Sequence, residues 1–329
     1  MSTRRKFITT VGAGAAASAL SVSPFGSIAR SISLNETNAK KIRIGIVGAE
    51  NSHATIVSKM LNVDKKFPGV EVVAIWGEKE EYARNAMNAG NIPLMVKDPE
   101  EMLGKIDAVI VDHRHPKYHL KAAVPFVKAG IPAFVDKPFC YRLDEGKEFL
   151  KMAGDLGTPV TSFSTIAQSD ATFDIVEQLK TLGDFDSIIR TGPVEVDSQW
   201  GGIFFYGVHI VQPLMFMFGD DIVEVKVNTF DNRGGANVVF GSGKIATLVF
   251  NTKYYGWDTY VDLKEGITSL KSRVEETDPA RPYKDMIEMF RTGKEPRTHE
   301  NILKCVAVLQ AMEKSVKSGK WERVAAVSL

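Results

Sequence analysis

Short apolar, β-branched runs alternate with longer amphipathic stretches along the first half of the chain, after residue 40. The runs that predict buried strands are 41–47, 70–76, 107–111 and 133–135. The stretches that predict helices are about 52–61, 78–89 and 118–129. Strands and helices alternating at this spacing are typical of βαβ units on a parallel sheet. Ligands of such sheets bind at the edge formed by the carboxyl ends of the strands.

The pattern changes after about residue 159. Alternating strands are predicted at 222–230, 236–240, 246–251 and 258–264, with glycine-rich turns between them, and helices at 283–292 and 300–318. We therefore expect an α/β chain with two domains after its N-terminal segment. A Rossmann-type parallel-sheet domain over 41–158 is followed by an α+β domain over 159–329, whose sheet is open and largely antiparallel.

The first 40 residues predict a twin-arginine export signal and a linker. Arg4-Arg5-Lys6-Phe7 precedes a weakly apolar, Ala- and Gly-rich run from Thr9 to Leu20. That run is too short to span a bilayer stably. A disordered tail with a chance arginine pair is the alternative. We expect a periplasmic or otherwise exported protein with no membrane span.

Composition excludes some partners. The chain has 41 Lys and Arg against 40 Asp and Glu, so its charge gives no reason to expect nucleic acid or an anionic membrane. Apolar residues at 44% and charged residues at 25% are the balance of a soluble globular protein. The two cysteines, Cys140 and Cys305, lie far apart in the sequence, and we expect two buried free thiols.

Four segments carry a family resemblance through their order and spacing. They are Gly45-Ile46-Val47-Gly48-Ala49 after the first strand, Val135-Asp136-Lys137-Pro138, Gly207-Val208-His209 opening an apolar helical run, and a closing helix from Glu300. Together they resemble the Gfo/Idh/MocA family, named for glucose-fructose oxidoreductase and inositol dehydrogenase. The match spans nearly everything after residue 40, and the Asp-Lys-Pro form indicates a divergent subgroup.

The resemblance implies hydride transfer between NAD or NADP and a hydroxyl of a carbohydrate or polyol. It implies that Lys137 contacts the nicotinamide ribose and the substrate hydroxyl, and that His209 is the general acid/base. It also implies a homo-oligomer formed through the C-terminal sheet. The chemistry agrees, because His titrates near neutrality and a lysine cation favours the developing alkoxide.

The chain departs from the family at its glycine turn. A dinucleotide turn has the form Gly-x-Gly-x-x-Gly, whereas this chain has Gly48-Ala49-Glu50-Asn51-Ser52-His53. Where the family has an acid after the second strand, this chain has Gly77, and Glu78 comes one position later. Where the family often has acids on either side of the histidine, this chain has Phe205 and Gln212. The residues we expect to contact the cofactor are Gly48, Ala49, Glu50, Asn51, Ser52, His53, Glu78, His113, Asp136 and Lys137.

Three other functions remain open. His113-Arg114-His115 has metal-ligand spacing, but a barrel hydrolase needs further ligands, so we expect this loop to cover the cofactor and expect no metal site. A non-catalytic carbohydrate-binding protein of the same fold is the second alternative. An NAD-dependent, redox-neutral glycoside hydrolase is the third. Aromatic residues near 200–206 and 254–257 could stack on a sugar or belong to the core.

Overall fold

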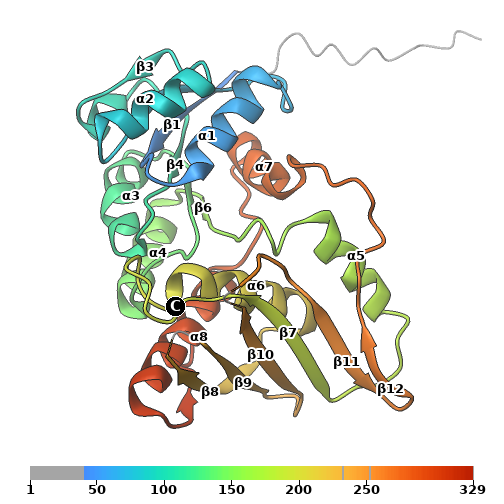
Figure 1. The fold of residues 1–329 in the computed structure, drawn as a ribbon. Coiled ribbons are helices and arrows are strands. Elements are labelled where there is room, and N and C mark those ends of the chain that lie inside the picture. The colour runs from blue at the N-terminus through green and yellow to red at the C-terminus, as the bar shows by residue number, and fades with distance from the viewer. Residues whose placement is uncertain (1–40, 232, 252, 329) are drawn as a thin grey trace, which may run out of the picture. The chain divides into compact units, whose positions relative to one another are not determined.

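The computed structural model describes residues 41–231, 233–251 and 253–328. The signal and linker predicted over residues 1–40 lie outside the described residues. Residues Lys40–Leu329 form one compact unit, in which two sheets are accompanied by helices (Figure 1).

The first sheet is parallel throughout and has the strand order β3-β2-β1-β4-β5-β6. Its strands are β1 Ile42–Val47, β2 Val70–Trp76, β3 Leu94–Met95, β4 Ala108–Val111, β5 Ala133–Val135 and β6 Val160–Thr161. The strands β2 and β3 extend the sheet on one side of β1, and the chain then crosses back to add β4, β5 and β6 on the other side. In open α/β sheets this reversal opens a crevice at the carboxyl ends of the two strands, here β1 and β4.

Helices connect these strands. They are α1 Ser52–Ser58, which continues as one π-helical stretch, η2 Lys59–Val63, then α2 Glu80–Ala89, the 3-10 turns η3 Pro99–Met102 and η4 Pro116–Tyr118, α3 His119–Lys128 and α4 Leu143–Leu156. The helix α2 shows why they form where they do. Glu80 and Glu81 occupy its first turn, where the helix dipole favours acids, while Ala83 and Ala86 face the core.

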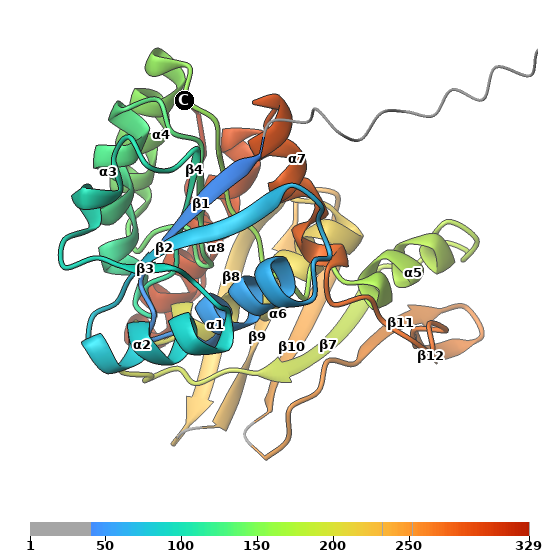
Figure 2. The same cartoon turned by 90° about the horizontal axis from the view of Figure 1, so that it is seen from above.

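The second sheet has the order β12-β11-β7-β10-β9-β8-β13 (Figure 2). Its strands are β7 Ser187–Pro193, β8 Ile222–Phe230, β9 Arg233–Phe240, β10 Ile245–Asn251, β11 Thr259–Leu263, β12 Gly266–Ser269 and β13 Glu322–Arg323. All neighbouring strands are antiparallel except β7 and β10. The predicted fold class, a Rossmann-type parallel sheet followed by a largely antiparallel sheet, is confirmed.

The remaining helices are α5 Asp170–Leu179, α6 Phe204–Phe218, η5 Arg281–Tyr283, α7 Lys284–Thr292 and α8 His299–Ser318. The helices α6 and α8 pack against each other and on the second sheet (Figure 1). Because α6 is apolar on almost every side, it is buried almost all round. One hydrophobic core contains Val135 from the end of β5, Phe204 from α6 and Leu309 from α8. This shared core places α6 beside the carboxyl edge of the first sheet.

Several sequence predictions shift at their ends. The helix expected to open at Gly207 begins three residues earlier, at Phe204, so His209 lies in its second turn rather than at its start. Cys140 and Cys305 are both buried and free. Within the described part of the chain, no helix is long and apolar enough to cross a membrane.

Candidate active site

The turn between β1 and α1 brings the ends of β1 and β4 together. Gly48 has φ +108°, and a Cβ built there would lie 2.6 Å from the carbonyl carbon of Asp112. Only glycine tolerates both this conformation and this approach. The first glycine of the fingerprint therefore keeps its function in a tight turn, although the two later glycines are replaced.

Glu78 reaches this turn from the end of β2. Its Oε2 accepts the backbone amides of Ala49 at 2.9 Å and Glu50 at 3.0 Å, and its Oε1 accepts Nδ1 of His113 at 2.7 Å. Burial alone would raise the pKa of Glu78, but His113 and the turn amides lower it, so the group is a carboxylate. An acid at this place binds the adenosine ribose in Rossmann domains. In this chain Gly77 holds that position, and the carboxylate of the next residue, Glu78, lies against the turn amides and His113.

The N-terminus of α1 is open to an anion. Asn51 is its N-cap residue but makes no side-chain capping bond, and none of the first-turn residues is acidic. Its side-chain Nδ2 instead donates to Oδ2 of Asp136 at 3.0 Å. Amides at a helix N-terminus hold the pyrophosphate in dinucleotide sites. The neighbouring Glu50 is the unfavourable feature, although burial and Glu78 raise its pKa.

Two buried carboxylates lie under this helix end. Asp136, at the end of β5, has Oδ1 3.1 Å from Nδ1 of His53 and Oδ2 3.4 Å from Nζ of Lys137. Burial would raise the pKa of Asp136, but Lys137 and His53 lower it well below its usual range. Asp112, at the end of β4, is only 1% exposed, and burial and Asp136 raise its pKa well above its usual range.

His209 is supported by a hydroxyl and not by a carboxylate. Its Nδ1 lies 2.7 Å from Oγ of Ser164, whose backbone amide donates to the side chain of Gln212. Burial and the Lys137 ammonium lower the pKa of His209 well below its usual range, so the imidazole is neutral at neutral pH. Ser164 is a long-range partner that no motif in the sequence indicated.

One cavity of about 420 Å³ lies beside the β1–α1 turn and is lined by residues from both sheets' segments. Its lining consists of Glu50, Asn51, Ser52, His53, Ile56, Arg114, Lys137, Thr165, Phe205, Tyr206, His209 and Tyr255. The structure thus brings Lys137 and His209 into one cavity with four residues of the glycine turn. Gly48 and Ala49 lie in the turn itself, Asp136 lies behind Lys137, and Glu78 and His113 pair beside the turn.

Arg114 is a lining residue that sequence reasoning missed. It lies in the histidine-rich loop, and its guanidinium stacks 4.8 Å from the ring of Trp200 and 5.3 Å from the ring of Phe205. These rings hold a positive charge on the wall of the cavity that faces α1. Its place between two histidines of one motif was the signal that could have identified it.

Among the described residues, the histidines of the histidine-rich loop do not come together with other side chains as a group of three or more potential metal ligands. Nδ1 of His113 bonds Glu78, and Nδ1 of His115 accepts the amide of Lys117 at 3.2 Å. Nδ1 and Nε2 of His119 lie 2.9 and 2.7 Å from the backbone carbonyls of Pro138 and His113, and the nitrogen that carries the proton donates to one of them. Each imidazole therefore has a separate structural partner.

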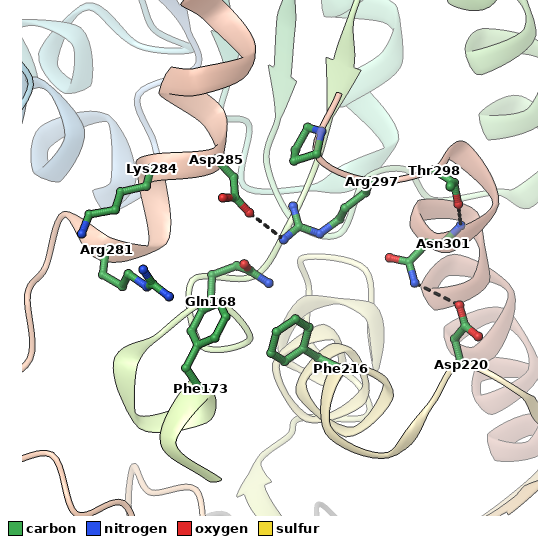
Figure 3. A pocket seen from close by; sticks show the side chains of 11 residues that line it. Gln168, Phe173, Phe216, Asp220, Arg281, Lys284, Asp285, Arg297, Thr298 and Asn301 are labelled. Carbon is green, nitrogen blue, oxygen red and sulfur yellow. Dashed lines mark hydrogen bonds and ion pairs between the residues drawn. The ribbon is translucent and has the colours of Figure 1, made fainter. Parts of the chain in front are cut away.

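A second cavity, of about 610 Å³, lies between α5, α7 and the start of α8 (Figure 3). Two pairs of its lining residues interact with each other: Arg297 with Asp285 at 3.4 Å, and Asn301 with Asp220 at 3.0 Å. It contains none of the predicted site residues. The smaller cavity beside the β1–α1 turn is therefore the candidate active site.

Comparisons with known proteins agree with this architecture. Residues 42–163 match a family described as "Oxidoreductase family, NAD-binding Rossmann fold", GFO_IDH_MocA. A search of curated proteins finds no match.

Three solved structures share the fold across most of both chains. GenD2 from gentamicin A biosynthesis, in complex with NAD, is 14% identical, with a TM-score of 0.74 and coverage of 87% of this chain and 97% of its own. Myo-inositol dehydrogenase from Lactobacillus casei, with NAD(H) and myo-inositol, is 13% identical, with a TM-score of 0.73 and coverage of 88% and 98%. A putative NADPH-dependent oxidoreductase from Desulfitobacterium hafniense is 16% identical, with a TM-score of 0.72 and coverage of 87% and 98%. The Rossmann domain of the chain therefore matches the Gfo/Idh/MocA oxidoreductase family, and the whole chain shares the two-sheet fold of these solved oxidoreductases.

Proposed function

We propose that this chain is an NAD-dependent oxidoreductase that oxidises a hydroxyl of a carbohydrate or polyol. The observation that carries the proposal is the shared cavity of Lys137 and His209 beside the open N-terminus of α1. The nicotinamide ring, when bound, supplies the hydride acceptor. The chain supplies the groups that bind the cofactor, orient the substrate and move a proton.

The residues around the β1–α1 turn fit a dinucleotide. Oε1 of Glu78 can accept a ribose hydroxyl besides His113, and the first amides of α1, with Arg114 lining the same cavity, suit a pyrophosphate. A carboxylate at the ribose favours NAD over NADP, because it repels a 2′-phosphate. Glu78 therefore makes NAD the preferred cofactor.

The two central residues divide the chemistry at the substrate. The buried Lys137 ammonium stabilises negative charge on the substrate oxygen as its proton leaves. His209 is neutral, and Ser164 occupies its Nδ1, so Nε2 is the atom that takes the hydroxyl proton. The carbon–hydrogen bond breaks as hydride, and the product is a carbonyl.

The cavity walls suit a ring with several hydroxyls. Phe205, Tyr206 and Tyr255 supply aromatic faces, while Asn51 and Thr165 supply hydrogen-bonding groups. The Lactobacillus casei relative was solved with myo-inositol, a polyol of this kind. Carbohydrates and cyclic polyols are therefore the first substrates to test.

The experiment has two readings. Purified protein is denatured and the supernatant is analysed by mass for nicotinamide nucleotides. Folded protein is then incubated with NAD⁺ and a panel of aldoses, glycosides and cyclic polyols, and absorbance at the wavelength of NADH is followed. We expect NADH to accumulate with at least one compound. Release of free sugar without NADH would indicate the redox-neutral hydrolase, and sugar binding with neither reaction would indicate a binding protein.

Two further proposals concern location and assembly. We propose export by the twin-arginine route, on the basis of Arg4-Arg5 and the apolar run that follows. Changing both arginines to lysine should retain the protein in the cytoplasm, and unchanged export would contradict the proposal.

We also propose a homo-oligomer through the second sheet, because Ile245 and Val249 of β10 are exposed on it, at 47% and 43%. Light scattering tests this, and a monomer would contradict it.

A further inference from the structure

The His53, Asp112 and Asp136 side chains form a group of potential metal ligands that the hydride-transfer chemistry does not use. One ligand atom from each lies within 4.8 Å of the other two. The three residues come from three different elements: the first turn of α1 and the ends of β4 and β5. The fold therefore assembles the group at the crevice edge, where parallel strands end.

Asp112 is the residue that needs a partner. It is 1% exposed, and neither of its carboxylate oxygens has a hydrogen-bond partner within 3.5 Å among the described residues, although the Ala54 amide and Asp136 lie close enough to influence its pKa. Its Oδ1 lies 3.8 Å from Nδ1 of His53. Burying a carboxylate without a partner is costly, and an ion that binds it would offset that cost.

Asp136 is arranged as a supported ligand. Its Oδ2 receives Asn51 at 3.0 Å and Lys137 at 3.4 Å, while its Oδ1 faces His53 at 3.1 Å. Hydrogen bonds to the outer oxygen of a carboxylate are the usual support of a metal ligand. The inner oxygen contacts only His53 among these groups, and an ion between the two residues would replace that hydrogen bond.

The spacing suits one ion. Two atoms bound to the same ion at about 2.0–2.2 Å are at most about 4.4 Å apart. The distances of 3.1 and 3.8 Å from Nδ1 of His53 lie within that limit. One imidazole nitrogen with carboxylate oxygens suits Zn²⁺ or Mn²⁺. A divalent cation would also stabilise the ionised form of Asp112, which burial and the neighbouring Asp136 disfavour.

We propose that His53, Asp112 and Asp136 bind one divalent transition-metal ion, Zn²⁺ or Mn²⁺, behind the wall of the candidate active site. The ion lies beside Lys137 and adds positive charge next to the substrate oxygen. This effect on the substrate rests on the proposed function, but the binding of the ion does not.

The test uses the folded chain without an affinity tag, because polyhistidine tags bind the same metals. Metal content after purification is measured by mass spectrometry. Chelator-treated protein is then titrated with ZnCl₂ or MnCl₂ in a calorimeter. For bound Mn²⁺, electron spin-echo modulation reports an imidazole nitrogen ligand. We expect one ion per chain and a nitrogen signal.

The variants are Asp112→Asn, His53→Gln and the control Asp155→Asn. Asp155 is an exposed carboxylate on α4, 2.7 Å from Lys151. Removing a ligand should lower the affinity for the ion by at least about 100-fold, and the control substitution should leave the affinity unchanged. Circular dichroism checks folding.

Two outcomes overturn the proposal: no ion bound by the wild type at millimolar metal, or affinity unchanged in both ligand variants. NADH binding, measured by fluorescence on the same samples, is a separate readout. Loss of NADH binding with the ion intact would contradict the proposed function and not the metal site.

Discussion

Replacing Glu78 by Gln removes a single charge from the end of β2 and tests cofactor choice. The carboxylate is fixed by two amides and by His113, so its position is set before any ligand arrives. Gln keeps one oxygen that can accept the amides. Any change in nucleotide preference therefore reports the charge and not the loss of the turn.

The size of the effect follows from Coulomb's law. A 2′-phosphate in the place of the ribose hydroxyl lies about 4 Å from the carboxylate, which gives about 4 kcal/mol per unit charge at an effective dielectric constant of ~20. The Glu78 side chain is 24% exposed, and we halve the repulsion to about 2 kcal/mol for solvent screening. That corresponds to roughly a 30-fold preference for NADH over NADPH.

Binding is measured by the fluorescence of NADH and NADPH on titration with protein, which requires no substrate. Wild type should prefer NADH by about 30-fold or more, and Glu78→Gln should reduce the preference to within about threefold. The control is Glu80→Gln, which removes an exposed charge paired with Arg84 on α2. Equal affinity of the wild type for both nucleotides, or a preference unchanged in Glu78→Gln, would refute the reasoning.

Three more outcomes are expected. Lys137→Met keeps the apolar stem but removes the charge, and turnover on the substrate found should fall by about 10²–10³-fold at saturating NAD⁺; a loss below tenfold contradicts its role. Gly48→Ala should destabilise the fold by about 2 kcal/mol or more in urea unfolding, because of φ +108° and the 2.6 Å contact, whereas Gly154→Ala inside α4, with free space around it, should be neutral or stabilising. Because the pKa values of His209 and His119 are lowered, the unfolded chain takes up protons below about pH 6.5 that the folded chain does not. The free energy of unfolding should then decrease as the pH is lowered, by up to about 1.4 kcal/mol per pH unit for each histidine. His209→Gln should reduce this slope in urea unfolding at pH 7.5, 6.5 and 5.5.

Strands with regular patterns were predictable from the sequence. The runs at 70–76 and 222–230 match β2 and β8 end to end, because apolar residues recur at the spacing a buried strand requires. The strand β7 was missed. Its apolar run contains Arg190, which is only 2% exposed and donates to Thr259 at 2.7 Å. The partner that makes a buried arginine tolerable in a strand lies 69 residues away in the sequence.

The site was predictable only where motifs carry it. The Asp-Lys-Pro and Gly-x-His segments placed Lys137 and His209 beside the carboxyl edge of the first sheet, and the structure has both in one cavity. The contacts that set their chemistry join distant segments. Ser164 lies 45 residues before the histidine it bonds, and Glu78 lies 29 residues after the amide it accepts. Spacing along the chain does not encode such pairs.

The lost fingerprint glycines have one structural explanation. In a Rossmann turn the third glycine lets the helix pack closely on the strand. Here that position is His53, and its imidazole enters the space between α1 and the ends of β4 and β5, against Asp136 and Asp112. The imidazole that replaces the third glycine therefore contacts α1, β4 and β5 residues at once, so polar contacts join α1 to the sheet at the point where a glycine would allow close packing.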